Sequence, residues 1–394
     1  MAAHVLDRSA GLRTRREERG ALALVRHVDV VLVAATLSLA ALGVIVVYAA
    51  TKGDFPLEPT YYAKRQLVFC VAGFFVMVAV AAIDFRRIAY WAEVVYGAVL
   101  LSLLAVLAIG RSVGAGTGAV SSGVAQRWIS LGPVQLQPSE FAVLAVIGLL
   151  AVKLGRRAAD LRLRRILVPL VLTAVVGLLI VKQPDLGTAV VLLVVVLAML
   201  VVAGVKARHL VLLLVLGGLA FFAGVELHLV HASQLQRLTS FLHPNSGAMS
   251  ANYQEDLAKQ AIGSGGLKGT GLFRGLYTNL NYVPEQSTDF IFATVGEQLG
   301  FVGSAAIIGL YAVVALRMLR AAQSAREPVG RLLCTGMLAF LVFSVFENIG
   351  MNIGLMPVTG IPLPFLSYGG SAIVVLFGAV GVVLNVEMRR HRYR

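Results

Sequence analysis

A single carboxylate, Asp289, stands where a long polar segment meets an apolar stretch that begins at Phe290. A carboxylate in that position could act as a general base and accept a proton from a hydroxyl group. The alternative is structural, because Asp also favours the N-cap of a helix and an apolar helix is expected to begin here. The residues around Asp289 do not decide between these two roles.

The polar segment before Asp289 is rich in glycine from Gly263 to Gly275 and contains the run GSGGLKGTG. The run superficially resembles a phosphate-binding loop, but Lys268 is followed by Gly269 instead of Ser or Thr, and no strand is expected before it. The nucleotide-binding interpretation is therefore rejected. Two interpretations stay open: a flexible loop, or a backbone cradle beside an anionic or sugar group.

Two further polar segments place charge next to apolar stretches. Arg127 precedes a tryptophan, a pair typical of an anchor at a membrane interface. Glu140 follows Pro138 at the start of an expected helix, where its charge needs a partner. Asp185 lies three residues after Lys182 in the turn KQPDLGT, either as a capping residue or as part of a shared external cavity.

The last polar constellation lies near the C-terminus. Glu347 falls inside an apolar stretch, which makes it a candidate site residue, although a role in holding helices together is nearly as well supported. The segment 357–370 contains three prolines and three glycines and cannot form a regular spanning helix. Non-helical backbone at membrane depth is tolerated only where it is buried in protein or lines a cavity.

Composition defines the class of protein. Of 394 residues, 58% are hydrophobic and only 14% are charged, and the mean hydropathy is +0.84. Cys70 and Cys334 both fall in apolar stretches, which predicts buried thiols and no disulfide. The sequence therefore predicts an all-α polytopic integral membrane protein with ten transmembrane helices, at about 29–50, 66–83, 88–109, 138–154, 166–182, 187–205, 209–229, 290–316, 331–355 and 370–387.

The distribution of charge predicts the topology. If the ends of the ten spans alternate between the two sides, 24 of the 34 Lys and Arg residues fall on the side of both termini. The positive-inside rule then places both termini in the cytoplasm and the large loop 230–289, between spans 7 and 8, outside. Residues 1–27 are expected to be a disordered basic tail and not a signal peptide, and 28–394 a single membrane domain. This clustering between spans also argues against nucleic acid as the partner of a chain with net charge +14.

All four polar constellations fall on the predicted outer side or at its membrane boundary. Their convergence predicts an external, partly membrane-embedded cavity lined by cations and carboxylates. A cavity of that kind suits a lipid-linked anionic substrate.

These segments also carry a family resemblance. The chain closely resembles the SEDS family (shape, elongation, division, sporulation), which includes RodA and FtsW, and it is more similar to the RodA branch. The resemblance covers nearly everything after the N-terminal tail. It rests on AQRWISLG with QPSE (125–140), KQPDLGTA (182–189), AIGSGGLKGTG (261–271), PEQSTDFIF with GEQLG (284–300) and NIGMNIGLMPVTGIPLPFLSYGGSA (348–372).

The resemblance implies a ten-span glycosyltransferase that polymerises lipid II into peptidoglycan at the outer face of the cytoplasmic membrane. It places the family's essential acid at Asp289, against the helix-cap interpretation. By the same matching, residues that line or support the substrate cavity, or could neutralise its pyrophosphate, would be Arg127, Glu140, Asp185, Lys259, Lys268, Glu297 and Ser367. The sequence leaves a divalent cation open, and the resemblance implies a class B penicillin-binding transpeptidase as partner.

Two other functions compete with this one. The main rival is a flippase for the same lipid-linked precursor, although transporters usually place polar groups near the bilayer midplane and show internal repeats, and neither feature is evident here. A non-catalytic scaffold would leave the carboxylates unexplained. One departure from the family is Val143, where relatives commonly have a lysine three residues after the acid at 140, so Glu140 needs another cation, or is protonated, or lines a locally different cavity.

Overall fold

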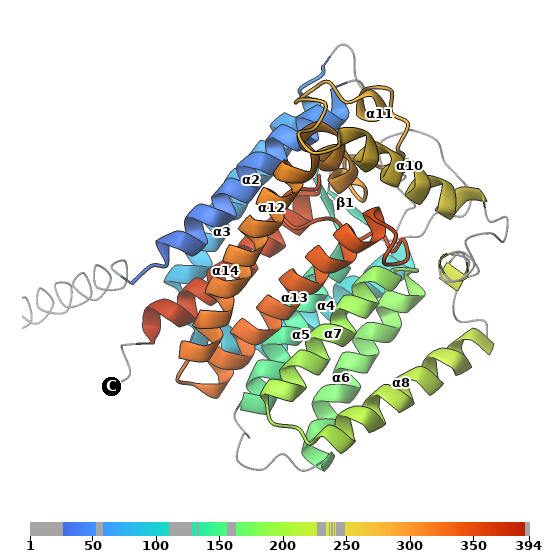
Figure 1. Ribbon diagram of the computed structural model, residues 1–394. Coiled ribbons are helices and arrows are strands. Elements are labelled where there is room, and N and C mark those ends of the chain that lie inside the picture. The colour runs from blue at the N-terminus through green and yellow to red at the C-terminus, as the bar shows by residue number, and fades with distance from the viewer. Residues whose placement is uncertain are drawn as a thin grey trace, which may run out of the picture.

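The computed structural model describes residues 27–52, 58–109, 128–131, 134–155, 163–226, 234–235, 237, 239, 241 and 249–390. Its elements, labelled as in Figure 1, are α2 (Val30–Thr51), α3 (Tyr61–Ala82), α4 (Phe85–Ile109), β1 (Ile129–Leu131), β2 (Val134–Leu136), α5 (Pro138–Gly155), α6 (Leu163–Lys182), α7 (Leu186–Val202), α8 (Ala207–Glu226), α10 (Met249–Gly265), α11 (Leu276–Asn279), α12 (Ile291–Ser324), α13 (Pro328–Asn352) and α14 (Gly370–Arg389). The expected basic tail, Arg127 and much of the loop 230–248 lie outside the described residues.

The predicted all-α membrane fold is confirmed. Eight of the described helices are long and apolar enough to cross a membrane, and shorter apolar helices at Ile166–Lys182 and Leu186–Val202 match the fifth and sixth predicted spans. Two features were not predicted. Residues 129–136 form a short antiparallel hairpin that pairs Ile129 with Leu136, and the long predicted loop contains the 17-residue helix α10.

Local chemistry explains where several helices begin. Asp29 caps α2, because its Oδ1 accepts a hydrogen bond from the Leu32 amide at 3.0 Å. Helices α5 and α13 both start at a proline, Pro138 and Pro328, whose missing N–H costs nothing in the first turn. Asp185 caps α7 in the same way as Asp29, which agrees with the capping alternative for that turn.

Helix α14 forms the centre of the bundle and is buried over most of its length. It packs closely on α3, where Gly381 faces the Met77 carbonyl and a methyl group in place of its hydrogen would approach that oxygen to 2.7 Å. Small residues let membrane helices approach one another in this way. The N-terminal end of α14 reaches the candidate site described below.

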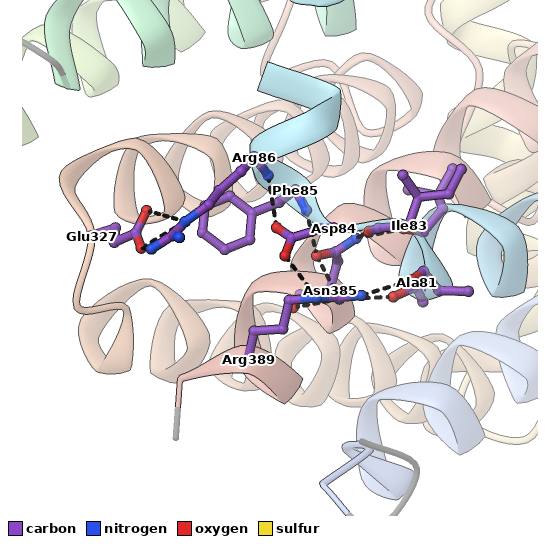
Figure 2. A network of polar contacts seen from close by, with 10 residues as sticks. Ala81, Ile83, Asp84, Phe85, Arg86, Glu327, Asn385 and Arg389 are labelled. Atoms are coloured by element: carbon purple, nitrogen blue, oxygen red, sulfur yellow. Dashed lines mark hydrogen bonds and ion pairs between the residues drawn. The ribbon is translucent and has the colours of Figure 1, made fainter. Parts of the chain in front are cut away.

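The opposite end of α14 is held by a network of polar contacts (Figure 2). The Asn385 side chain accepts from the Phe85 amide at 3.0 Å and from Arg389 Nη1 at 2.7 Å, and it donates to the carbonyls of Val80 and Ile83. Arg389 donates in addition to the Ala81 carbonyl at 3.0 Å. These bonds satisfy the backbone groups at the turn between α3 and α4.

The glycine-rich segment is a docking surface between backbones. Thr270 and Gly271 donate their amides to the carbonyls of residues 297 and 298 on α12, and the amides of Phe301 and Val302 donate to the carbonyls of residues 266 and 267. Gly269 has φ +79°, and a methyl group there would lie 2.2 Å from the Gln298 carbonyl oxygen. The flexible-loop interpretation is therefore wrong, because the segment is bonded to α12 and its glycines admit the backbone of that helix; a cradle beside an anionic or sugar group stays a prediction.

We call residues 249–280, comprising α10, the glycine-rich segment and α11, the platform. Helix α12 turns sharply at Gly300, where φ is +66°, and the platform is bonded to it on both sides of this break. Figure 1 shows the platform covering one end of the bundle, opposite the end where α14 finishes. We call the end that carries the platform the site end.

Candidate functional site

A cavity of about 130 Å³ opens at the site end, between α5, α7, α13, the start of α14 and the non-helical segment 353–369. That segment is non-helical as its prolines and glycines predict. The described polar side chains that line the cavity come from five parts of the chain: Gln137, Glu140, Thr188, Thr288, Asp289, Ser344 and Tyr368. The structure thus brings two of the predicted site residues, Asp289 and Glu140, to one cavity.

Asp289 does not cap α12. The N-cap is Phe290, and no side chain caps this helix, so the helix-cap interpretation of Asp289 is wrong. Its side chain instead borders Gly360, where an added methyl group would lie 3.2 Å from Asp289 Oδ2. Gly360 has φ +81°, a conformation that favours glycine, so the bend of the 353–369 segment brings backbone close to this acid.

Two buried asparagines fix the backbone of Asp289. Asn348 donates to the carbonyls of Asp289 and Ile361, both at 2.8 Å, and so joins the turn before α12 to the 353–369 segment. One helical turn later, Asn352 donates to the same Asp289 carbonyl at 3.2 Å and accepts from the Ala293 amide at 3.1 Å. Both side chains lie at the bundle core, where these bonds satisfy backbone groups that water cannot reach.

Glu140 faces the cavity from the first turn of α5, beside Val143. Its Oε2 is buried and has no hydrogen-bond partner among the described residues. Val143, one turn further along α5, also lines the cavity and gives it an apolar wall at that point. An oxygen left without a partner in a buried wall is suited to a polar group that arrives with a substrate.

Asp185 lies behind the cavity wall. Its carboxylate accepts hydrogen bonds from Gln137 Nε2 at 3.0 Å, Ser139 Oγ at 2.8 Å and Thr188 Oγ1 at 2.9 Å. Two of these donors, Gln137 and Thr188, line the cavity themselves. Asp185 therefore orients two cavity residues from two parts of the chain, and its contact with substrate stays a prediction.

Four other predicted site residues lie away from the lining of this cavity. Lys259 pairs with Glu255 at 2.5 Å on α10, and Lys268 is exposed on the platform. Glu297 is fully buried and accepts from the amides of residues 277 and 278, so it secures α11 to α12. Ser367 accepts from the Leu363 amide at 2.8 Å and donates to the Thr288 carbonyl, which shapes the turn before Asp289.

Sequence reasoning missed several residues beside the cavity. Arg237 lies 3.4 Å from the carbonyls of Val358 and Thr359, and its Nη1 would be 3.9 Å from a methyl group on Gly360, the residue that Asp289 also borders. Glu347, a candidate from sequence, is buried and accepts a hydrogen bond from the Thr359 hydroxyl. No pattern in the sequence singles out Arg237, because its partners lie more than a hundred residues away.

Tyr368 adds a hydroxyl to the cavity wall. It lies outside the helices, its amide donates to the Ser287 carbonyl at 2.8 Å, and its ring packs edge-on against Tyr62. Burial raises the pKa of Tyr368 above the usual tyrosine value, so the hydroxyl stays protonated and can donate a hydrogen bond.

The cavity combines two carboxylates with neutral hydrogen-bonding groups. Among the described residues that line it, none is Lys or Arg. Within the same described part of the chain, no three His, Cys, Asp or Glu residues are grouped closely enough to hold a metal ion. The chemistry available to the described lining is proton transfer by a carboxylate and recognition of hydroxyl and amide groups.

Comparison with known proteins agrees with this fold and site. The family of FtsW, RodA and SpoVE cell cycle proteins matches residues 30–392. The chain is 36% identical to the peptidoglycan glycosyltransferase MrdB of Escherichia coli K12, over 92% of this chain and 94% of the relative. It is 37% identical to stage V sporulation protein E of Bacillus subtilis 168, over 93% and 98%.

Two solved structures match as well, each at 30% sequence identity. One belongs to work on the structural coordination of polymerization and crosslinking by a peptidoglycan synthase complex, with a TM-score of 0.76 over 93% of this chain and 99% of that one. The other is the rod shape determining protein RodA of Thermus thermophilus, with a TM-score of 0.67 over 92% and 98%.

The fold and the acidic cavity define a multi-span membrane protein with a site near one face. The matches show which one: the chain belongs to the SEDS family (FtsW, RodA, SpoVE) of peptidoglycan glycosyltransferases, which act in cell elongation and division. The family predicted from the sequence motifs is thus confirmed, and MrdB and the RodA structure are among its similar members.

Proposed function

We propose that the cavity polymerises lipid II, the undecaprenyl-pyrophosphate-linked disaccharide peptide, with Asp289 as the catalytic base. One lipid-linked glycan is the donor and a second lipid II is the acceptor. The observation that carries this proposal is the placement of Asp289, whose backbone is held by two buried asparagines while the residue borders the cavity. A carboxylate fixed at that wall can meet a sugar hydroxyl without moving the protein.

The proposed reaction is a single displacement. As the acceptor 4-hydroxyl attacks the anomeric carbon of the donor, Asp289 takes the hydroxyl proton, and the bond from that carbon to the pyrophosphate oxygen breaks. The electron pair of the broken bond leaves with undecaprenyl pyrophosphate. A direct displacement inverts the anomeric carbon and needs no covalent intermediate, which makes the protein an inverting hexosyltransferase.

The leaving pyrophosphate gains negative charge and needs cations to stabilise it. Arg127, predicted from the family motif, lies outside the described residues. Arg237 is the described cation best placed for this role, since it borders the same glycine as Asp289. Lys259 and Lys268 do not line the described cavity, so this proposal assigns no step to them.

The proposed orientation puts the site end outside the cell. Of the 34 Lys and Arg residues, the 24 on the side of both termini face the cytoplasm under the positive-inside rule. The reaction then takes place at the outer face of the cytoplasmic membrane. We propose that residues 28–394 act there as one membrane domain.

A class B penicillin-binding transpeptidase is the proposed partner. The support is the similarity to a chain from work on a peptidoglycan synthase complex that polymerises and crosslinks. The product proposed here, an uncrosslinked glycan strand with attached peptides, is the substrate that a crosslinking enzyme requires.

The decisive experiment compares Asp289→Asn with the parent chain, both purified and supplied with lipid II in detergent. Asparagine keeps the size of the side chain but cannot take a proton, so we expect polymerisation to fall by about 10²–10⁴-fold. Binding of lipid II and the melting temperature should stay near those of the parent chain. Asp256→Asn is the matched control, because Asp256 is an exposed acid on α10 that does not line the cavity.

Two results would count against the proposal. Near-normal polymerisation by Asp289→Asn would remove Asp289 from the reaction. A parent chain that moves lipid II between leaflets of a vesicle, but makes no glycan, would favour the flippase alternative.

A further inference from the structure

The platform carries exposed apolar side chains that the catalytic site does not use. We call five of them the rim: Leu267, Leu272, Phe273, Leu276 and Leu280. Leu267 is 72% exposed and Leu276 is 61% exposed, although each lies in a well-ordered segment bonded to α12. Five large apolar side chains within fourteen residues form a patch of the kind that usually covers a partner or a membrane.

The rim continues a surface that already faces lipid. The amides of Phe301 and Val302 donate to the carbonyls of Gly266 and Leu267, so Leu267 lies directly beside these two residues. Phe301 and Val302 are 67% and 63% exposed on a membrane-spanning helix, as expected for side chains in contact with lipid. From Phe301 to Ser324, α12 is about 36 Å long at 1.5 Å per residue, enough for a bilayer core of about 30 Å.

Helix α2 gives independent evidence for the depth of the rim in the membrane. This helix ends at Thr51, and the next residue, Lys52, donates to the Phe273 carbonyl at 2.5 Å while its ammonium group lies 5.7 Å from the centre of the Phe273 ring. Gln286 also donates to the Ala50 carbonyl at 2.8 Å. The site ends of two spanning helices, α2 and α12, therefore lie at the same depth in the membrane as the rim.

Cations accompany the rim in the positions that a lipid surface favours. Lys268 follows Leu267, Arg274 follows Phe273, and both are exposed, while the half-buried Lys52 contacts Phe273. Lys and Arg near the ends of membrane helices keep their apolar stems in the hydrocarbon and their charge at the phosphates. An apolar side chain next to a cation can contact the acyl chains of a phospholipid and its anionic head group at the same time.

We propose that the rim inserts into the head-group region of the leaflet at the site end, with Lys268 and Arg274 bound to lipid phosphates. The platform is then a membrane-resting element and not a loop surrounded by water. Because its backbone is bonded to α12 on both sides of Gly300, the contact with lipid holds the start of that helix at a fixed depth. The inference rests on the lipid-facing helices and not on the reaction at Asp289.

The test places a fluorescent label on the rim in reconstituted vesicles of equal parts phosphatidylcholine and phosphatidylglycerol. Cys70 and Cys334 are both buried, so the parent chain serves as the unlabelled blank and Leu267→Cys and Leu276→Cys each add one accessible thiol. Phe301→Cys is the lipid-facing control and Asp256→Cys the water-facing control. No enzyme activity is needed, so failure of the proposed reaction would leave this result unaffected.

We expect both rim labels to be quenched strongly by lipids that carry a nitroxide high on the acyl chain and weakly by aqueous iodide, as at Phe301. The Asp256 label should show the reverse. Iodide quenching of the rim labels equal to that at Asp256 would overturn the proposal. Protection that appears only when a class B transpeptidase is added would overturn it as well, because the patch would then be a protein interface.

A second measurement tests the cations. Removing phosphatidylglycerol from the vesicles should increase quenching of the Leu267 label in the parent background by acrylamide, a neutral quencher that the lipid charge does not repel. In a background with Lys268→Gln and Arg274→Gln, the same change of lipid should have no effect on that label. A response to phosphatidylglycerol that survives both substitutions would refute the assignment of these two side chains to lipid phosphates.

Discussion

Replacing Asn348 with alanine should separate the positioning of Asp289, the proposed base, from general stability. Asn348 donates to the carbonyls of Asp289 and Ile361, each at 2.8 Å, and is fully buried. In Asn348→Ala the Asp289 carbonyl keeps a bond from Asn352 at 3.2 Å, but the Ile361 carbonyl loses its donor. One buried carbonyl without a partner costs ~1–3 kcal/mol, and one lost hydrogen bond adds ~0.5–1.5 kcal/mol. The free energy of unfolding should therefore fall by about 2–4 kcal/mol.

The effect on catalysis should exceed the effect on stability. Without Asn348, the turn before α12 is no longer joined to the 353–369 segment, so Asp289 and its neighbour Gly360 can shift apart. A misplacement of about 1 Å can cost ~10²-fold in rate. We expect kcat to fall by about that factor while KM stays within a few-fold, because Gln137, Glu140 and Tyr368 still line the cavity.

Asn385→Ala is the matched control. Asn385 is an equally buried asparagine that bonds the backbone of the α3–α4 turn, at the end of α14 far from the cavity (Figure 2). Its loss should lower the melting temperature at least as much as Asn348→Ala and leave kcat near that of the parent chain. Polymerisation of lipid II and melting temperature would be measured for both, below both melting transitions. Equal losses of kcat in the two variants, or normal kcat in Asn348→Ala, would refute the positioning role.

Three further predictions follow from the charge distribution, the cavity and the platform. A reporter fused at Asn245 should behave as external and one fused after Arg394 as cytoplasmic; the same side for both would contradict the ten-span topology. Glu140→Gln should reduce polymerisation less here than in relatives with a lysine one turn later, since no cation is left unpaired; equal losses would show that Glu140 acts differently. Gly269→Ala should destabilise the protein by ~1–3 kcal/mol through clash with the α12 backbone, whereas Gly263→Ala, with open space around it, should not; equal melting temperatures would contradict the docking of the glycine-rich segment.

The sequence predicts most of the fold because membrane spans are encoded locally. A run of about twenty apolar residues defines a spanning helix without reference to its neighbours, and Pro138 marks the start of α5 in the same local way. The non-helical backbone of segment 357–370 is also predicted locally, from its prolines and glycines. Hydropathy does not determine which side of the membrane each loop faces. That orientation is inferred from the distribution of charge, and it stays a prediction.

The site is only partly encoded in this local manner. The carboxylate at 289 stands out because it borders an apolar stretch, yet its local context equally suits a helix cap. What rules out the cap is the geometry of the turn, in which Phe290 occupies the N-cap position. The roles of Asn348 and Asn352 depend on carbonyls about sixty residues away, so no local pattern in the sequence distinguishes them from polar residues that hold helices together.

The glycine-rich segment shows the same limit most clearly. Its glycines suggest a flexible backbone, but four of the backbone groups in the segment pair with the main chain of α12 on the two sides of Gly300. Glycine there admits a close approach of two main chains, and close approach orders a segment instead of loosening it. Only the identity of the second main chain, residues 296–302, distinguishes the two cases, and the sequence does not supply it.

The charges around the cavity indicate how the two substrates would be arranged. The carboxylate of Asp289 lines a cavity proposed to receive a pyrophosphate, and repulsion would oppose binding of that group directly beside it. Arg237, which borders Gly360 as Asp289 does, is the described cation that would offset this repulsion and hold the pyrophosphate near that glycine, while the acceptor hydroxyl would lie against Asp289. As the proposed reaction proceeds, Asp289 would become neutral while the leaving group gains charge, so negative charge would move from the base toward the arginine. An acid and an arginine that border one glycine would place the proton acceptor and the cation for the leaving group close together.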